Sequence, residues 1–179
     1  MNRLSKTFFL GSYLGGTIAL WILGTVIWGL SWTYNFPEES LWMFIALFIF
    51  LVPLSIYVSV VQCIFIYKVW ASIQDGHVRS GPCKALGFLF IPLFNFYWIF
   101  QAVWGFAVDF NKYAARNNIS AAPRLPEGLF LAYCILYVVG IIPFVGIAAN
   151  IANFVIAAIL ISHTCDAVNA LPSPNVKSS

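Results

Sequence analysis

The chain has 179 residues, of which 61% are hydrophobic, 18% aromatic and only 8% charged. Soluble domains carry roughly 25% charged residues, so too little polar surface remains to cover a water-soluble fold. The net charge of +3 is small, and basic residues beside apolar segments are better explained by membrane topology than by nucleic acid binding. The composition therefore predicts an all-α integral membrane protein, with one membrane domain over residues 1–170.

The first two predicted spans are residues 8–32 and 41–67, and each is longer than the about 20 residues that one crossing needs. Gly11 and Gly15 form a Gly-x-x-x-Gly pair in the first span. Such small faces let helices approach closely in lipid, and we expect packing within the chain here rather than homodimerisation. The loop between the spans has only acidic charges, and Pro53 is expected to kink the second span.

The next apolar run, from Ala85 to Val108, is uncharged and has basic residues on both flanks, namely Lys68, Arg79 and Lys84 before it and Lys112, Arg116 and Arg124 after it. A simple crossing should carry its Lys/Arg excess on one flank. Pro92 and Asn95 interrupt the run with a helix breaker and a turn former. The pattern predicts a re-entrant helical hairpin over about residues 85–112. Because non-helical backbone at membrane depth must be sheltered, we expect other spans to enclose its turn.

The remaining spans are predicted at residues 129–142 and 147–168, joined at Pro143, and the composition of the tail, 171–179, predicts disorder. With four transmembrane helices and the re-entrant hairpin, all nine Lys/Arg residues lie on one side. With five full spans they divide five to four. The tendency of basic loops to stay in the cytoplasm favours the first arrangement, with both termini cytoplasmic.

The two Ile-Pro breaks form a weak internal echo. Ile91-Pro92 and Ile142-Pro143 each precede a long predicted helix, and those helices end in the polar patches 109–111 and 166–169. Internal repeats with interrupted helices occur in transporters. Short apolar matches also arise by chance in so biased a composition, so both interpretations stay open.

Polar side chains at membrane depth are candidate functional residues because burying them is costly. The candidate intramembrane polar cluster consists of neutral amides, namely Gln62, Asn95, Gln101, Asn150 and Asn153. A proton relay would require Asp, Glu or His at these depths, so hydrogen bonding between helices is favoured over a substrate site. A second group is expected to form ion pairs at the cytoplasmic face: Arg79, Lys84, Asp109, Arg116 and Asp166.

The four cysteines, Cys63, Cys83, Cys134 and Cys165, follow no Cys-x-x-Cys spacing. His77 and His163 lie at similar depth, which leaves a soft-metal site geometrically open, but reduced cysteines acting as small hydrophobic residues are favoured. No phosphate loop, nucleophile elbow or metalloprotease motif occurs. We therefore expect no catalytic residues, no metal and no cofactor, and a protein that is not an enzyme.

One stretch resembles a known group of proteins. Trp70, Arg79, Pro82 and the run Gly-x-x-x-Ile-Pro-x-x-Asn over residues 87–95 are similar to uncharacterised bacterial multi-span membrane proteins classed as a domain of unknown function. The resemblance covers roughly residues 65–135. It implies a bacterial inner (cytoplasmic) membrane location and brings no activity, cofactor or catalytic residue.

Two functions follow as expectations. The first is a non-enzymatic accessory or scaffold protein that presents the cytoplasmic loops 68–84 and 109–127 to a protein partner or to lipid, with a homo-oligomer also open. The second is a small transporter or channel, favoured by the broken helices and by Asn150 and Asn153, which share one helix face.

Overall fold

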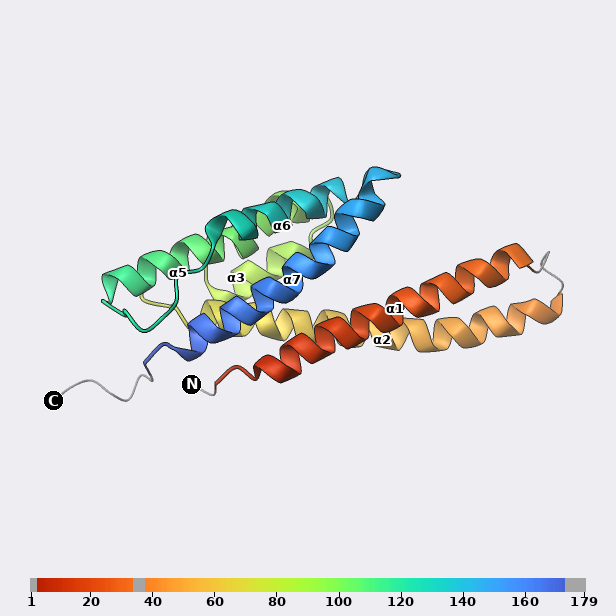
Figure 1. Ribbon diagram of the computed structural model, residues 1–179, viewed down its shortest axis with the longest axis horizontal. Helices are drawn as coiled ribbons and strands as arrows, with labels where there is room; N and C mark the ends of the chain where they lie inside the picture. The colour runs from red at the N-terminus through yellow and green to blue at the C-terminus, as the bar shows by residue number, and fades with distance from the viewer. Residues whose placement is uncertain (1–2, 34–37, 173–179) are drawn as a thin grey trace. The chain divides into compact units, whose positions relative to one another are not determined.

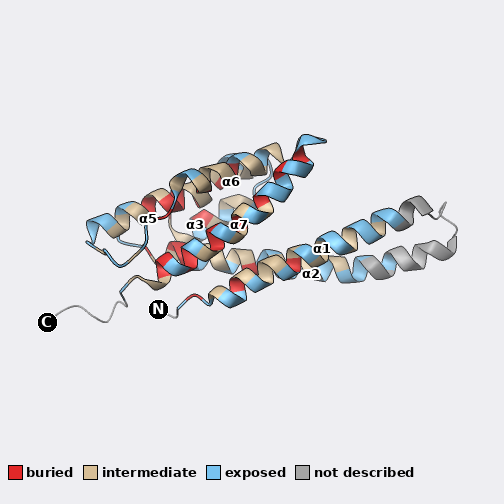
Figure 2. Ribbon diagram, in the orientation of Figure 1, coloured by how far each residue is buried: buried red, intermediate tan, exposed pale blue. Residues whose placement is uncertain are grey.

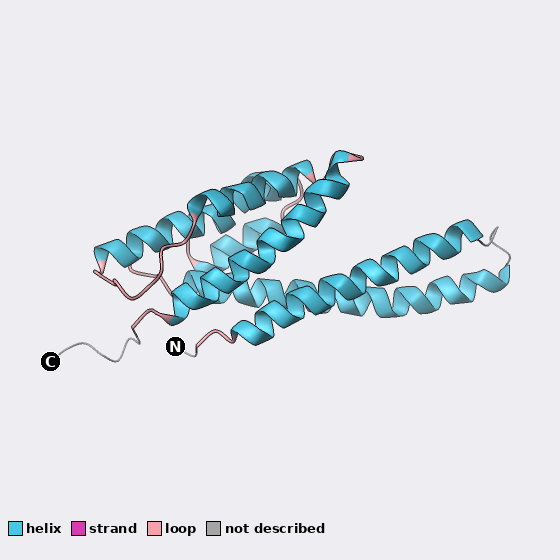
Figure 3. Ribbon diagram, viewed as in Figure 1, coloured by secondary structure: helices cyan, strands magenta, loops and turns pink. Residues whose placement is uncertain are grey.

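The computed structural model describes residues 3–33 and 38–172, without the side chains of residues 30–44, 46 and 47. Every regular element in this part of the chain is a helix, as Figure 3 shows. The acidic residues of the first predicted loop and residues 173–179 of the predicted disordered tail lie outside the described residues and side chains.

Three helices are long and apolar enough to cross a membrane: α1 (Lys6–Thr33), α2 (Glu38–Ala71) and α7 (Val145–Asn169). They correspond to the first, second and fourth predicted spans. The third predicted span, 129–142, corresponds to α6 (Glu127–Val139). With 13 residues, α6 is about 20 Å long. It is therefore shorter than a hydrocarbon core of about 30 Å.

The chain divides into two compact units. The N-terminal unit comprises Thr7–Cys63, and the main unit comprises Met1–Lys6 and Ile64–Ser179. Within the N-terminal unit, the Ser12 and Tyr57 hydroxyls are 2.9 Å apart, and Gly16 lies directly against the Val58 side chain. The expected packing within the chain is made by Ser12 and Gly16, one step along from the Gly-x-x-x-Gly pair, whereas a side chain added at Gly11 or Gly15 would meet open space.

The main unit contains two helical hairpins (Figure 1). In hairpin A the first leg is α3 (Pro82–Gly87) with the 3₁₀ helix η1 (Phe88–Phe90). Its second leg runs through α4 (Phe94–Ile99), the π-helix η2 (Phe100–Trp104) and α5 (Gly105–Arg116). In hairpin B, α6 is the first leg and α7 the second. The helix break predicted at Pro92 is confirmed, because no helix includes residues 91–93.

The π-helix in hairpin A departs from the continuous helix that the sequence predicts after Pro92. A π-helix widens the backbone turn and changes which carbonyl groups are bonded within the helix. Around this segment, the fully buried Trp70 donates its indole N–H to the carbonyl of Ala102 at 2.9 Å. Cys134 contacts the carbonyl of Ile99 at 3.5 Å. Buried donors from α2 and α6 thus meet the second leg of hairpin A at this irregular turn.

The second leg of hairpin A runs antiparallel to α6. The rings of Phe96 and Tyr137 lie near the two turns, with centroids 6.3 Å apart. At the far end, Asn111 bonds the backbone of Leu125. Both hairpin turns therefore lie at one end of the main unit, which we call the tip end. The termini of the legs lie at the other, which we call the polar end. Figure 2 shows buried positions gathered along α5 and the C-terminal part of α7.

Candidate functional site at the polar end

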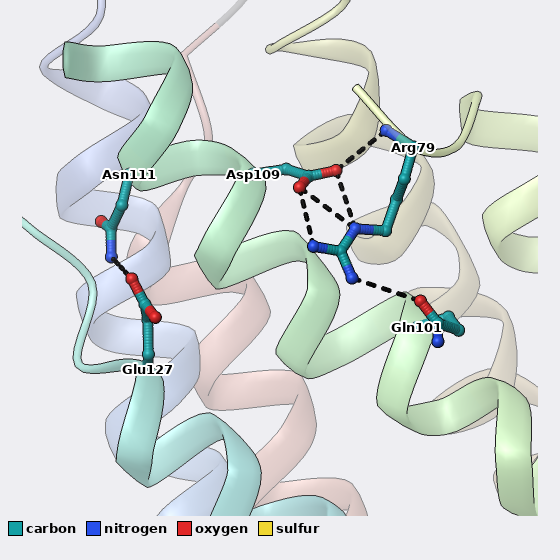
Figure 4. Close-up of polar contacts among 5 residues, drawn as sticks. All are labelled: Arg79, Gln101, Asp109, Asn111 and Glu127. Atoms are coloured by element: carbon teal, nitrogen blue, oxygen red, sulfur yellow. Dashed lines mark hydrogen bonds and ion pairs between the residues drawn. The ribbon is translucent and has the colours of Figure 1, made fainter. Parts of the chain in front are cut away.

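Arg79 and Asp109 form the centre of the polar end (Figure 4). Asp109 is 6% exposed and accepts hydrogen bonds from the Arg79 side chain at 2.9 and 3.1 Å. The backbone N–H of Arg79 also donates to Asp109, at 2.9 Å. A planar guanidinium matches a carboxylate in this two-point geometry, which a lysine cannot reproduce. Because the backbone is bonded as well, the pair fixes the 72–81 loop to α5.

A polar ladder continues from this pair toward the tip end. Tyr97, Gln101, Gly105 and Asp109 follow at four-residue intervals along the second leg of hairpin A. Arg79 donates to the side-chain oxygen of Gln101, Oε1, at 3.2 Å. The side-chain amide nitrogen of Gln101, Nε2, donates to the Tyr97 hydroxyl at 3.2 Å. At Gly105 an added Cβ would lie 3.1 Å from Arg79 Nη1, so the missing side chain leaves room for the guanidinium. The ladder thus connects a charged pair to a neutral amide and a phenol.

Two asparagine clamps close the polar end. Asn111 accepts from the N–H of Leu125 and donates to its carbonyl, both at 2.9 Å. Asn169 binds both backbone groups of Leu4 in the same way, at 2.7 and 2.8 Å. Each leucine stands two residues before the first residue of a helix, α6 or α1. The second leg of each hairpin therefore carries an asparagine that binds a leucine backbone, within α5 in hairpin A and at the last residue of α7 in hairpin B.

Each acidic side chain described in the main unit is engaged by a base. Asp166 pairs with Lys6 at 2.7 Å, Asp75 with Arg116 at 2.7 Å, and Glu127 with Arg124 at 3.7 Å. The hydrogen bond from Arg116, followed by one from the backbone N–H of His77, lowers the pKa of Asp75 from its ordinary value. The structure therefore separates the predicted face group into distinct pairs. Its remaining member, Lys84, lies over the Phe88 ring at 5.9 Å.

The predicted amide cluster is dispersed. Gln101 belongs to the ladder, and Gln62 is half-buried in α2. Asn95 and Asn153 each bury a side-chain oxygen without a partner among the described residues. Asn150 is exposed and donates to the carbonyl of Gly140 at 3.1 Å, which ties α7 back to the end of α6. These amides thus lie in separate surroundings, and the structure brings only Gln101 into the polar network.

An open groove of about 730 Å³ lies between the end of α5 and the start of α6. Its polar lining includes Asn111, Lys112, Asn118, Arg124 and Glu127. Within the described residues, no group of three or more His, Cys, Asp and Glu side chains is placed to hold a metal ion. The polar end therefore offers a surface groove with basic side chains at its margin.

Sequence reasoning missed three parts of this site: the ladder, the clamps and the Trp70 bond. The four-residue spacing from Tyr97 to Asp109 was visible in the sequence and would have placed these residues on one helix face. The polar patches 109–111 and 166–169 contain the two clamp asparagines, so these patches were the sequence signal for the clamps. Nothing in the sequence indicated the π-helix that Trp70 meets.

Comparison with protein-family models, with curated proteins and with solved structures found no match to this chain.

Proposed function

We propose that the chain is a bacterial inner-membrane accessory or scaffold protein whose polar end faces the cytoplasm. In this topology α1 and α2 cross the bilayer, hairpin A is re-entrant and both termini are cytoplasmic. The Lys/Arg distribution supports this orientation, since all nine then lie on the cytoplasmic side. The distribution is the same whether hairpin B crosses fully, as in the four-span prediction, or turns back within the bilayer.

The observation that carries the proposal is that the polar groups of this end hold backbone in place. Arg79 and Asp109 fix the 72–81 loop, and within that loop Gln74 bonds the carbonyls of Trp70 and Ser80. Asn111 fixes the approach to α6. Groups used in this way build a rigid surface, as a scaffold requires.

The charge of that surface indicates the chemistry of its partner. The acids of the main unit are all ion-paired, whereas Arg3, Lys84 and Lys112 remain in excess of them. The groove beside Lys112 and Arg124 is therefore suited to a negatively charged protein segment. Anionic lipid headgroups are the alternative ligand.

A photo-cross-linking residue at Lys112 or Asn118, on the groove, tests this proposal in cells. The matched control is the same residue at Ile56, an exposed apolar position on α2. We expect a discrete protein adduct from the groove positions, and its yield should fall when Arg124 is changed to Glu. Adducts at the control level only would overturn the proposal of a protein partner, and adducts containing only lipid would assign the surface to headgroups.

A small transporter or channel is the second candidate function. The buried oxygens of Asn95 and Asn153, without a partner among the described residues, favour it because such groups normally find a hydrogen-bond donor. Solute flux in reconstituted liposomes that depends on Asn153 would support this function over the scaffold.

A further inference from the structure

The tip end of the main unit is apolar and exposed. Phe144 is 90% exposed and Leu93 is 81% exposed, the two highest values among the large hydrophobic side chains described. Other exposed apolar residues surround them, namely Phe90, Ile91, Ile141, Ile142, Val145 and Ile147. Within the main unit, α7, which corresponds to the fourth predicted span, leaves the turn of hairpin A exposed. An apolar surface of this kind marks a binding site for other apolar material.

The backbone of both turns is folded in one unusual way. Leu93 has φ 65° and ψ −41°, and Phe144 has φ 65° and ψ −57°. In each turn the N–H two residues after the proline bonds the proline carbonyl at 2.8 Å, which is a γ-turn with positive φ. The next N–H, of Asn95 or Gly146, bonds the carbonyl of the preceding isoleucine. Because these groups are bonded within the turn, the turn needs less shelter from protein than an open loop would.

The legs limit how far this end can reach. Asn111 and Glu127 meet at the polar end, 2.8 Å apart, and α6 rises from there for 13 residues. That length is about 20 Å, against a hydrocarbon core of about 30 Å. No charged residue occurs from Gly128 to Cys165. With the charges of Glu127 and Arg124 at the membrane surface, the tip stops inside the core.

α7 is longer than α6, with 25 residues, and its two halves differ in burial. Among its last thirteen residues, those buried are Ala157, Leu160, Ile161, Thr164, Cys165, Ala167 and Val168. Among the twelve before Ala157, only Gly146, Ala149 and Asn153 are buried. The C-terminal part of α7 is thus the more buried part, although Ile159, His163 and Asp166 are exposed. The more exposed part, the twelve residues of α7 before Ala157, has about the length of α6.

We infer that hairpin B is a second re-entrant hairpin. Both tips then end at the same depth inside the hydrocarbon core, between the cytoplasmic surface and the bilayer midplane or close to that midplane. The inference rests on the cytoplasmic orientation proposed above and goes beyond it. A fully crossing hairpin B would instead place Ile141, Ile142 and Phe144 in water on the far side. The occupant of the tip surface is lipid hydrocarbon, and the main unit acts as a one-sided wedge in the membrane.

Single cysteine substitutions test the inference in the full chain. Phe144→Cys and Leu93→Cys report on the tips, Ser120→Cys on the cytoplasmic side, and Ser40→Cys on the predicted outer loop. Each variant is treated with a membrane-impermeant maleimide in whole cells with a permeabilised outer membrane and in inside-out vesicles. All four are made with Cys83, an exposed thiol at the polar end, replaced by serine. This parent protein gives the background from the remaining thiols, and labelling after detergent solubilisation shows that each new thiol is reactive.

We expect both tip thiols to stay at background, at least tenfold below the controls, in both preparations and to react fully in detergent. A nitroxide at position 144 should then be relaxed by oxygen rather than by an aqueous nickel chelate. Labelling of Phe144→Cys in whole cells at the level of Ser40→Cys would show a full crossing and overturn the inference. Labelling in inside-out vesicles would place the tip outside the bilayer and overturn it equally. The controls at Ser40 and Ser120 test the proposed orientation separately, because reversed labelling of these two contradicts the orientation whatever the tips do.

Discussion

Arg79 combines two tasks that a different cation would not perform together. Its side chain meets both oxygens of Asp109 and also reaches Gln101, while its own backbone N–H bonds the same carboxylate. Gly105 gives the guanidinium room beside the helix. The Asp109 side chain is 8% exposed, so the charge depends on this partner for compensation. A buried charge left alone costs far more than an exposed one.

Removing the cation should therefore be costly. Arg79→Ala is expected to lower the free energy of unfolding in detergent by about 3 kcal/mol, since it leaves a buried carboxylate unpaired. Lys6→Ala breaks the exposed pair with Asp166, whose side chains are 41% and 51% exposed. It should cost about 0.5 kcal/mol or less. Thermal or denaturant unfolding of both variants measures the difference, and equal losses would refute a special role for the Arg79 pair.

The Asp75–Arg116 pair predicts a pH dependence. The folded-state pKa of Asp75 is lowered, so the pair stabilises the loop at pH values above the unfolded pKa of about 3.9. That stabilisation is lost as the pH falls through the lower, folded-state pKa. In Arg116→Gln the Asp75 pKa should rise toward its ordinary value. An NMR titration of the Asp75 carboxyl carbon measures the shift, and an unchanged pKa in the variant would contradict the assignment to Arg116.

At the scale of elements, the two hairpins share more than their sequences indicated. Both turn through a γ-turn with the same two hydrogen bonds, and each second leg carries an asparagine that binds a leucine backbone. The two asparagines are not at equivalent positions, because Asn111 is 18 residues after Leu93 and Asn169 is 25 residues after Phe144. The part that the hairpins share is therefore the turn, and both turns lie at the tip end.

Glycines at the two ends of the hairpin B turn, Gly140 and Gly146, allow the ends of α6 and α7 to approach each other closely. At Gly146 an added Cβ would collide with the backbone of Gly140, which cannot rotate away. Gly146→Ala should therefore lower the free energy of unfolding by about 2 kcal/mol, as overpacking does elsewhere. Gly128→Ala, in α6, meets open space and should be neutral or slightly stabilising, because alanine favours helix. Thermal unfolding in detergent compares them, and a stable Gly146→Ala protein would argue against this close approach.

Much of the element order could be predicted from the sequence, because apolar run length and proline position are local properties. The helix break at Pro92 and the ends of α1, α2 and α7 follow from them. The π-helix could not, since it depends on Trp70, a residue distant in sequence that bonds Ala102. Asp109 and Arg79 were both recognised as candidates, but their pairing needs the fold of a loop. The exposure of the hairpin A turn within the main unit could not be predicted either, because it depends on a positive-φ γ-turn that bonds part of its own backbone.

At the scale of the whole molecule, the charged and the apolar residues of the main unit are separated to opposite ends. Each described acid is ion-paired at the polar end, and the most exposed large hydrophobic residues are at the tip end. This distribution of charged and apolar side chains determines which end of the main unit enters a membrane. This one-sided distribution of charge supports the scaffold, whereas a permeation path through the tip end would have to use its neutral amides, Asn95 and Asn150.

Asn153 distinguishes the two functions. The Asn153 side-chain oxygen is buried without a partner among the described residues, although the sequence suggested a bond between helices. Since replacing an unsatisfied buried polar group with an apolar one of similar size is nearly neutral, Asn153→Leu should change the free energy of unfolding by less than about 1 kcal/mol. Gln101→Leu is the matched control, because it removes real bonds to Arg79 and Tyr97 and should destabilise the fold. In a scaffold, Asn153→Leu should also leave groove cross-linking at Lys112 unchanged. Loss of solute flux in liposomes from a variant that remains fully stable would instead make Asn153 part of a substrate path, and the transporter would become the better account of the protein.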